Sequence, residues 1–114
     1  MKLERRKHAE TISKKLISEY FITNHWDLND LYGLITVTGV EISADSSYID
    51  IYVSAIQNQS DLTKTLAKHS HEIHRLLAKK IDFMKVPRVR FRYDESWETL
   101  GKISHIISNL NKND

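Results

Sequence analysis

The chain of 114 residues has no cysteine, one proline and only three glycines. Without cysteine it can form no disulfide and carry out no thiol chemistry, a composition compatible with a reducing cytosol. Because the three glycines stand apart, they do not form a phosphate-binding loop. No apolar run approaches the roughly 20 residues needed to span a bilayer, and the charged N-terminus lacks the apolar segment of a secretory signal. We therefore expect a soluble, cytoplasmic protein that does not act at a membrane.

Catalytic and metal-binding motifs are missing as well. No serine lies in a nucleophile elbow, and no base-orienter pair can be identified. Three histidines fall within six residues, at His69, His71 and His74, but the HEIH spacing differs from the HExxH motif of zinc proteases. With no cysteine and no other cluster of ligands, we expect no metal, no cofactor and no enzymatic activity.

The size of the chain bounds its organisation. Hydrophobic side chains make up 40% of the residues, which allows one modest core. We expect a single domain over residues 1–110, followed by a short tail at 111–114 that frays. Nothing in the sequence requires more than a monomer.

Positive charge is concentrated in residues 64–92. This segment holds nine Lys or Arg against two acids, a local net charge of +7 in a chain whose total is +2. Near its end, Val89, Phe91 and Tyr93 alternate with three arginines, so a strand would place the two sets on opposite faces. Focused positive charge favours a polyanion, and guanidinium groups favour phosphate. The alternative is an edge strand kept soluble by arginine.

Hydrophobic periodicity predicts alternating helices and strands. Ala9, Ile12, Leu16 and Tyr20 recur at helical spacing, whereas residues 22–32 are rich in Asn and Asp and indicate a loop. We expect helices over residues 2–21, from 60 or 61 to 81, and from 94 or 96 to 110, and strands over residues 33–44, 48–54 and 88–93.

Two interruptions in these patterns are informative. In the first strand the apolar side chains fall at odd positions first, Ile35 and Val37, and then at even positions, Val40 and Ile42. In a regular strand these two pairs would point to opposite faces, and a bulge at Gly39 would return all four to one face. In the long helix, polar residues 69–71 interrupt the apolar stripe and indicate a break between two shorter helices. The first two strands should form a hairpin, and helices must cover one face of the sheet, which predicts an α+β fold.

Three blocks of the sequence, taken in order, are similar to one family: LITVTGVEIS at residues 34–43, DIYVS at 50–54 and VPRVRFRYDES at 86–96. The first helix adds a basic residue followed by Ile-Ser and Leu, at Arg6, Ile12, Ser13 and Leu16. Over roughly residues 5–110 the chain resembles ribosome-binding factor A, an assembly factor of the small ribosomal subunit. No single block is a strong motif, but their order and spacing together are fairly specific.

The resemblance implies a type II KH-like fold in the order helix-strand-strand-helix-kink-helix-strand-helix, with a three-stranded sheet covered by helices on one face. It also implies a single KH-like RNA-binding domain that binds 16S ribosomal RNA and assists late maturation of the 30S subunit, often in connection with growth in the cold. Members of the family are not enzymes. The expected partners are therefore the small subunit and its RNA, with other assembly factors as further candidates.

In this family an interhelical kink with small residues, in an Ala-x-Gly-like pattern, replaces the GxxG loop of KH domains. Here residues 69–71 read His-Ser-His at that place, so the chain departs from the family where the family is distinctive. The resemblance makes the kink and the following helix the RNA-facing surface. The candidate RNA-binding residues, in order of rank, are Lys68, His69, Ser70, His71, Arg75, Lys79 and Lys80, then Lys85, Arg88, Arg90 and Arg92, then Arg5 and Arg6. For each of them a solvated surface side chain is the alternative.

Two other functions remain open on the sequence alone. One is a general KH-class module for single-stranded nucleic acid, without ribosomal specificity. The other is a small protein-interaction adaptor that uses the apolar stripe of Leu100, Ile103, Ile107 and Leu110. In an adaptor this stripe should be exposed, whereas in an assembly factor it should pack on the sheet.

Overall fold

The computed structural model describes residues 2–24 and 26–95, and no helix among them is long and apolar enough to cross a membrane. The elements are α1 (Leu3–Asn24), α2 (Trp26–Tyr32), β1 (Ile35–Ile42), β2 (Tyr48–Ala55), the short 3-10 helix η1 (Gln59–Asp61), α3 (Leu62–Ala67), α4 (Ser70–Lys80) and β3 (Arg88–Tyr93). The predicted last helix, with its apolar stripe between residues 100 and 110, lies outside the described residues.

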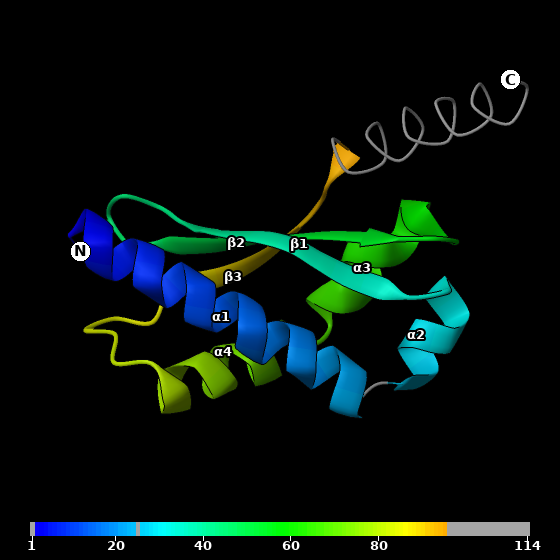
Figure 1. The fold of residues 1–114 in the computed structure, drawn as a ribbon, viewed down its shortest axis with the longest axis horizontal. Helices are drawn as coiled ribbons and strands as arrows, with labels where there is room; N and C mark the ends of the chain where they lie inside the picture. The colour runs from blue at the N-terminus through cyan, green and yellow to red at the C-terminus, as the bar shows by residue number, and fades with distance from the viewer. Residues whose placement is uncertain (1, 25, 96–114) are drawn as a thin grey trace, which may run out of the picture.

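The three strands form one sheet in the order β1-β2-β3. β1 and β2 are antiparallel, as expected of a hairpin, whereas β3 runs parallel to β2. A parallel neighbour requires the chain to cross back over the sheet, and α3 and α4 make that connection. α1, α3 and α4 lie on the same side of the sheet (Figure 1). The predicted α+β architecture, with helices covering one face of the sheet, is confirmed.

The inward side of β2 is the centre of the core. Ile49, Ile51 and Val53 have no exposed surface, and burial of each such aliphatic side chain contributes about 1.5–3 kcal/mol. The crossover helices supply four fully buried partners: Leu62, Leu66, Ile73 and Leu77. Because successive strand residues point to opposite faces, Tyr48 and Asp50 of β2 lie on the face that these helices do not cover.

The register of the hairpin shifts between Val37 and Gly39. This β-bulge compensates the change of parity in the sequence, because Ile35, Val37, Val40 and Ile42 are all buried on the helix side. The predicted bulge is therefore confirmed, with Thr38, the residue before Gly39, as the one left out of the register.

The core-facing line of α1 differs from the expected one. The buried side chains follow a spacing of four: Ala9, Ser13, Ile17 and Phe21. Ile12, Leu16 and Tyr20, which the apolar pattern favoured together with Ala9, are only partly buried and flank this line. The reason is Ser13, a polar residue with no exposed surface that interrupts the apolar pattern at the position where the helix meets the sheet.

The prediction of a loop over residues 22–32 is wrong. α1 continues to Asn24, and α2 occupies most of the remainder. Leu28 and Tyr32 lie one helical turn apart and both pack against the core. The hydroxyl of Tyr32 also donates a hydrogen bond to Oγ1 of Thr65, at 2.7 Å. This burial outweighs the turn preference of the nearby Asn and Asp residues, which is a weak local term.

The predicted break in the long helix is confirmed between α3 and α4. Lys68 and His69 form the connecting turn, and their backbone N–H groups donate to the carbonyl oxygens of Thr65 and Leu66 at 3.2 and 2.9 Å. Neither residue is left-handed: His69 has φ −96° and ψ 2°, and Lys68 is close to helical. The chain therefore forms this kink without the glycine that the family pattern would supply.

Gly33 precedes β1 and Gly39 lies at its bulge, and we expect substitution by alanine to change the stability of the fold differently at the two positions. Gly33 has φ +80°, and an added Cβ would lie 3.1 Å from Cβ of Ile56, whereas Cβ at Gly39 would meet nothing within 4 Å. We expect Gly33→Ala to lower the free energy of unfolding by about 1–2 kcal/mol. Gly39→Ala should leave it unchanged or raise it by up to about 1 kcal/mol. Urea unfolding followed by circular dichroism measures both, and equal losses would contradict this assignment.

Candidate nucleic-acid interface

An open groove of about 620 Å³ lies where the start of α4 meets the start of β3. Its lining comes from three parts of the chain that are distant in sequence. The residues are Ser47 and Tyr48 from the hairpin, Ser70, His71 and His74 from α4, and Lys85, Val86, Arg88 and Val89 from the start of β3 and the segment that leads into it. The groove thus joins the kink to the arginine-bearing strand, the two regions that the sequence singled out separately.

The charge of this lining has one sign. Lys85 and Arg88 bring an ammonium and a guanidinium group, and His71 and His74 bring imidazole N–H donors. Ser47, Ser70 and Tyr48 add hydroxyl groups, and none of the described residues that line the groove is acidic. A concave surface with cationic and hydroxyl donors and no carboxylate favours an anion, and it has the donor types that contact phosphate in nucleic acids.

The start of α4 adds backbone donors. α4 spans eleven residues, and its N-cap residue His69 makes no side-chain cap hydrogen bond. The first N–H groups of a helix have no partner within the helix and form the positive end of its dipole. Ser70 and His71 lie in this first turn and also line the groove. The positive end of the α4 dipole and the cationic side chains therefore both favour an anion in the groove.

His69 lies on the other side of the kink, between α1 and α4. Its ring contacts those of Tyr20 and Phe21 edge-on, with centroids 6.4 and 6.2 Å apart. The hydroxyl of Tyr20 donates a hydrogen bond to the carboxylate of Glu72 in α4. Burial, together with this carboxylate, raises the pKa of Tyr20 well above its usual value, so the hydroxyl keeps its proton. These contacts hold the kink against α1 and place His69 outside the groove.

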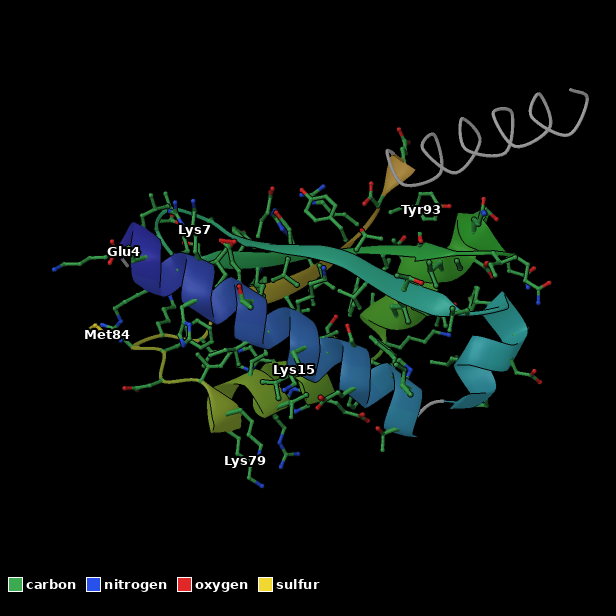
Figure 2. The ribbon with its side chains drawn as sticks, viewed as in Figure 1. Glu4, Lys7, Lys15, Lys79, Met84 and Tyr93 are labelled. Carbon is green, nitrogen blue, oxygen red and sulfur yellow. The ribbon has the colours of Figure 1, made fainter. Side chains whose placement is uncertain are left out.

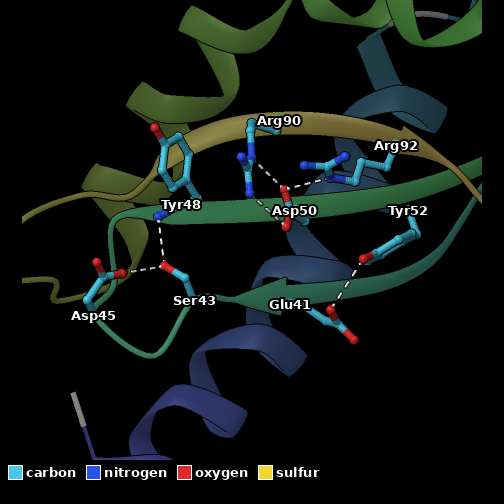
Figure 3. Close-up of polar contacts among 8 residues, drawn as sticks. All are labelled: Glu41, Ser43, Asp45, Tyr48, Asp50, Tyr52, Arg90 and Arg92. Atoms are coloured by element: carbon cyan, nitrogen blue, oxygen red, sulfur yellow. Dashed lines mark hydrogen bonds and ion pairs between the residues drawn. The ribbon is translucent and has the colours of Figure 1, made fainter.

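Two of the three arginines of β3 are held by one carboxylate (Figure 3). Asp50 of β2 accepts hydrogen bonds from Nε and Nη2 of Arg90, at 2.7 and 3.1 Å, and from Nε of Arg92 at 3.2 Å. The guanidinium of Arg90 also lies 3.9 Å from the ring centroid of Tyr48. The hydrogen bonds to Asp50 raise the pKa of Arg90 further. The predicted outward face of β3 is present, but Arg90 and Arg92 are largely committed to Asp50.

The other predicted site residues are spread over the surface. Lys68 is exposed in the turn, and Arg75, Lys79 and Lys80 are exposed on α4 without lining the groove. Figure 2 shows Lys79 pointing away from the sheet. Arg5 lines two smaller hollows beside Asp82, and Arg6 is half-buried on α1. Of the predicted residues, the groove brings together Ser70, His71, Lys85 and Arg88.

Tyr48 and His74 were missed as site residues. Tyr48 is directly opposite Arg88 in the parallel register of β2 and β3, a pairing that the sequence did not predict. His74 follows Ser70 by four residues and lies on the same face of α4, so helical spacing from Ser70 is the sequence signal that identifies it. Among the described residues, no group of three or more His, Cys, Asp or Glu could hold a metal ion.

The tip of the hairpin is fixed by Asp45, which positions one wall of the groove. Oδ1 of Asp45 accepts hydrogen bonds from the Ser43 hydroxyl at 2.8 Å and from the backbone N–H of Ser47 at 3.1 Å. The backbone N–H of Arg88 in turn donates to the carbonyl oxygen of Ser47 at 2.9 Å. Hydrogen bonds from Ser47 and Ser43 lower the pKa of Asp45 to about 2.

Residues 4–107 match the model of the family described as Ribosome-binding factor A. A ribosome-binding factor A of Petrotoga mobilis is 35% identical over 112 residues, which cover 96% of this chain and 94% of the relative. Another, from Macrococcus caseolyticus, is 35% identical over 102 residues, which cover 87% of this chain and 88% of the relative.

Solved structures of similar shape carry the same family name. The crystal structure of ribosome-binding factor A from Thermus thermophilus matches with a TM-score of 0.67 at 23% identity, covering 77% of this chain and 93% of that one. A homology model of the Thermus thermophilus factor, fitted into a cryo-EM map of a complex of the 30S subunit with that factor, matches with a TM-score of 0.64 at 22% identity and covers 78% and 94%. At these identities the likeness shows the fold, and it confirms the predicted KH-like arrangement.

The lowered pKa of Asp45 predicts a specific acid response. A carboxyl whose pKa is lower in the folded protein stabilises the fold above its unfolded pKa, near 3.9, and this contribution is lost as pH falls through the folded value of about 2. NMR titration of the side-chain carboxyl should therefore find its midpoint near pH 2. The Asp45→Asn variant should show a flatter loss of stability between about pH 4 and pH 2. A midpoint near pH 4 would mean that the Ser43 and Ser47 hydrogen bonds do not form in solution.

Proposed function

The chain belongs to the ribosome-binding factor A family, and on that premise we propose that it binds the small ribosomal subunit in the cytoplasm through 16S ribosomal RNA and assists late maturation of the 30S subunit. In this proposal the protein acts by binding and not by catalysis, and it acts as a monomer. The observation that supports it most directly is the groove at the kink, whose lining is cationic, rich in hydroxyl groups and, over residues 2–24 and 26–95, free of carboxylates.

The groove supplies the elements of a phosphate-binding surface. Lys85 and Arg88 neutralise backbone phosphates and release their counterions, which gives binding that weakens as salt rises. The first N–H groups of α4 donate to a phosphate oxygen at the positive end of the helix. Ser70 and the imidazole donors of His71 and His74 add hydrogen bonds to phosphate or to the ribose 2′-hydroxyl, the group that distinguishes RNA from DNA.

The Thermus thermophilus factor, whose fold this chain shares, has been fitted into a map of its complex with the 30S subunit. This supports the small subunit as the partner here. The mechanism that we propose is conformational. If the groove binds one arrangement of the immature RNA more tightly than another, occupancy shifts the RNA toward that arrangement by the ratio of the two affinities.

The three arginines of β3 differ in whether a carboxylate binds them: Asp50 pairs with Arg90 and Arg92, whereas Arg88 lines the groove. Arg88 and Arg92 lie on the same strand and the same face, and both are exposed. Arg92 donates to Asp50, whereas Arg88 lines the groove. The two residues therefore form a matched pair: one substitution at each removes the same charge from the same strand.

We expect Arg88→Ala to weaken binding to isolated small subunits by about five- to tenfold. The slope of log affinity against log salt should fall by about one, because one phosphate contact is lost. Arg92→Ala should change both quantities little, since that guanidinium is hydrogen-bonded to Asp50 and does not line the groove. Sedimentation at several salt concentrations gives both readouts, and circular dichroism checks the fold. Equal effects of the two variants would contradict the groove as the RNA-facing site.

A further inference from the structure

Tyr48 is the only Phe, Tyr or Trp side chain among the described residues that line the groove. It lies at the start of β2, directly opposite Arg88 in the parallel register. The guanidinium of Arg90 lies over its ring at 3.9 Å from the centroid, and Asp50 holds that guanidinium by two hydrogen bonds (Figure 3). The ring is thus supported on one face by a cation that is itself fixed in place.

The rest of the Tyr48 ring has no stacking partner, and its hydroxyl no hydrogen-bonded side chain, in the part of the chain that the structure describes. There the cation–π contact with Arg90 is the one ring interaction that Tyr48 makes. The side chain is only partly buried. An aromatic ring held from one side and open to a cationic groove on another can accept a second flat group by stacking.

Nucleic-acid bases are the flat groups that accompany phosphate. In a duplex the bases stack on each other and offer only their edges, so an aromatic side chain can stack only on a base that is unpaired or turned out of the helix. Lys85 and Arg88 lie in the same groove as Tyr48 and can hold the phosphates on either side of such a base.

Resting on the proposed function above, we propose that Tyr48 is a stacking platform for an unpaired RNA base, so that the groove selects single-stranded over double-stranded segments of the ribosomal RNA. Arg90 and Asp50 are positioning residues in this arrangement: they fix the ring and do not contact the RNA. The two arginines that the sequence assigned to phosphate thereby separate in role, with Arg88 contacting RNA and Arg90 acting through Tyr48.

Tyr52 provides the matched control. It follows Tyr48 by four residues on the same strand and the same face, so it shares the alternation that makes both tyrosines point outward. Its hydroxyl, however, donates to the carboxylate of Glu41 at 3.3 Å, and it does not line the groove. Burial and Glu41 raise the pKa of Tyr52 above its usual value.

The test uses a short single-stranded RNA that carries one 2-aminopurine, and the same sequence in a duplex. Stacking of this base on an aromatic ring quenches its fluorescence. For the wild-type protein we expect quenching on binding and tighter binding to the single strand than to the duplex. Tyr48→Leu should lose the quenching and bind the single strand about tenfold or more weakly. Tyr48→Phe and Tyr52→Leu should both behave like the wild type.

An Arg90→Leu variant tests the positioning role, since it should reduce quenching while leaving the salt slope of binding unchanged. Wild-type affinity and quenching in Tyr48→Leu, with weaker binding in Arg88→Ala, would overturn the stacking platform but leave the groove as the RNA site. Tighter binding of the duplex would also overturn it. If the wild-type protein bound neither this RNA nor isolated small subunits, the proposed function itself would fail.

Discussion

The burial of one side of β2 is the constraint on which the rest of the structure depends. Ile49, Ile51 and Val53 lose all contact with solvent beneath the helices, so the side chains between them must point outward. β3 adds to the free edge of β2 in parallel, and this direction requires the α3–α4 crossover. The break in that crossover brings the first turn of α4 beside the start of β3, and the groove forms between them.

Local patterns predicted most of this architecture because alternation and helical spacing depend on neighbours in sequence. The bulge at Gly39 and the break near His69 were found as defects in otherwise regular patterns, and both are present. The features that the sequence did not predict are ones that tertiary packing determines. α2 depends on the burial of Tyr32 against α3. Ser13 is buried because it lies on the same face of α1 as the other core residues of that helix. Propensity alone does not carry that information.

The candidate site was predicted only in part, for a related reason. Sequence shows that residues 64–92 carry a net charge of +7, but it does not show which cations already have partners. Asp50 lies fourteen residues before this segment and takes up two of its arginines. The parallel register that brings Asp50 to Arg90 also brings Tyr48 to Arg88. Strand pairing therefore divides the three arginines of β3: Arg88 lines the groove, whereas Arg90 and Arg92 share the single carboxylate of Asp50.

The central claim is that the groove between α4 and β3 faces the RNA, and the absence of cysteine allows a direct test. Single Lys85→Cys and Thr11→Cys variants would carry the same short photoactivatable crosslinker, the first in the groove and the second on an exposed position of α1. Each would be bound to isolated small subunits and irradiated. The account predicts crosslinks to 16S ribosomal RNA from position 85 and few from position 11. Equal crosslinking from the two positions, or crosslinking mainly from position 11, would contradict it.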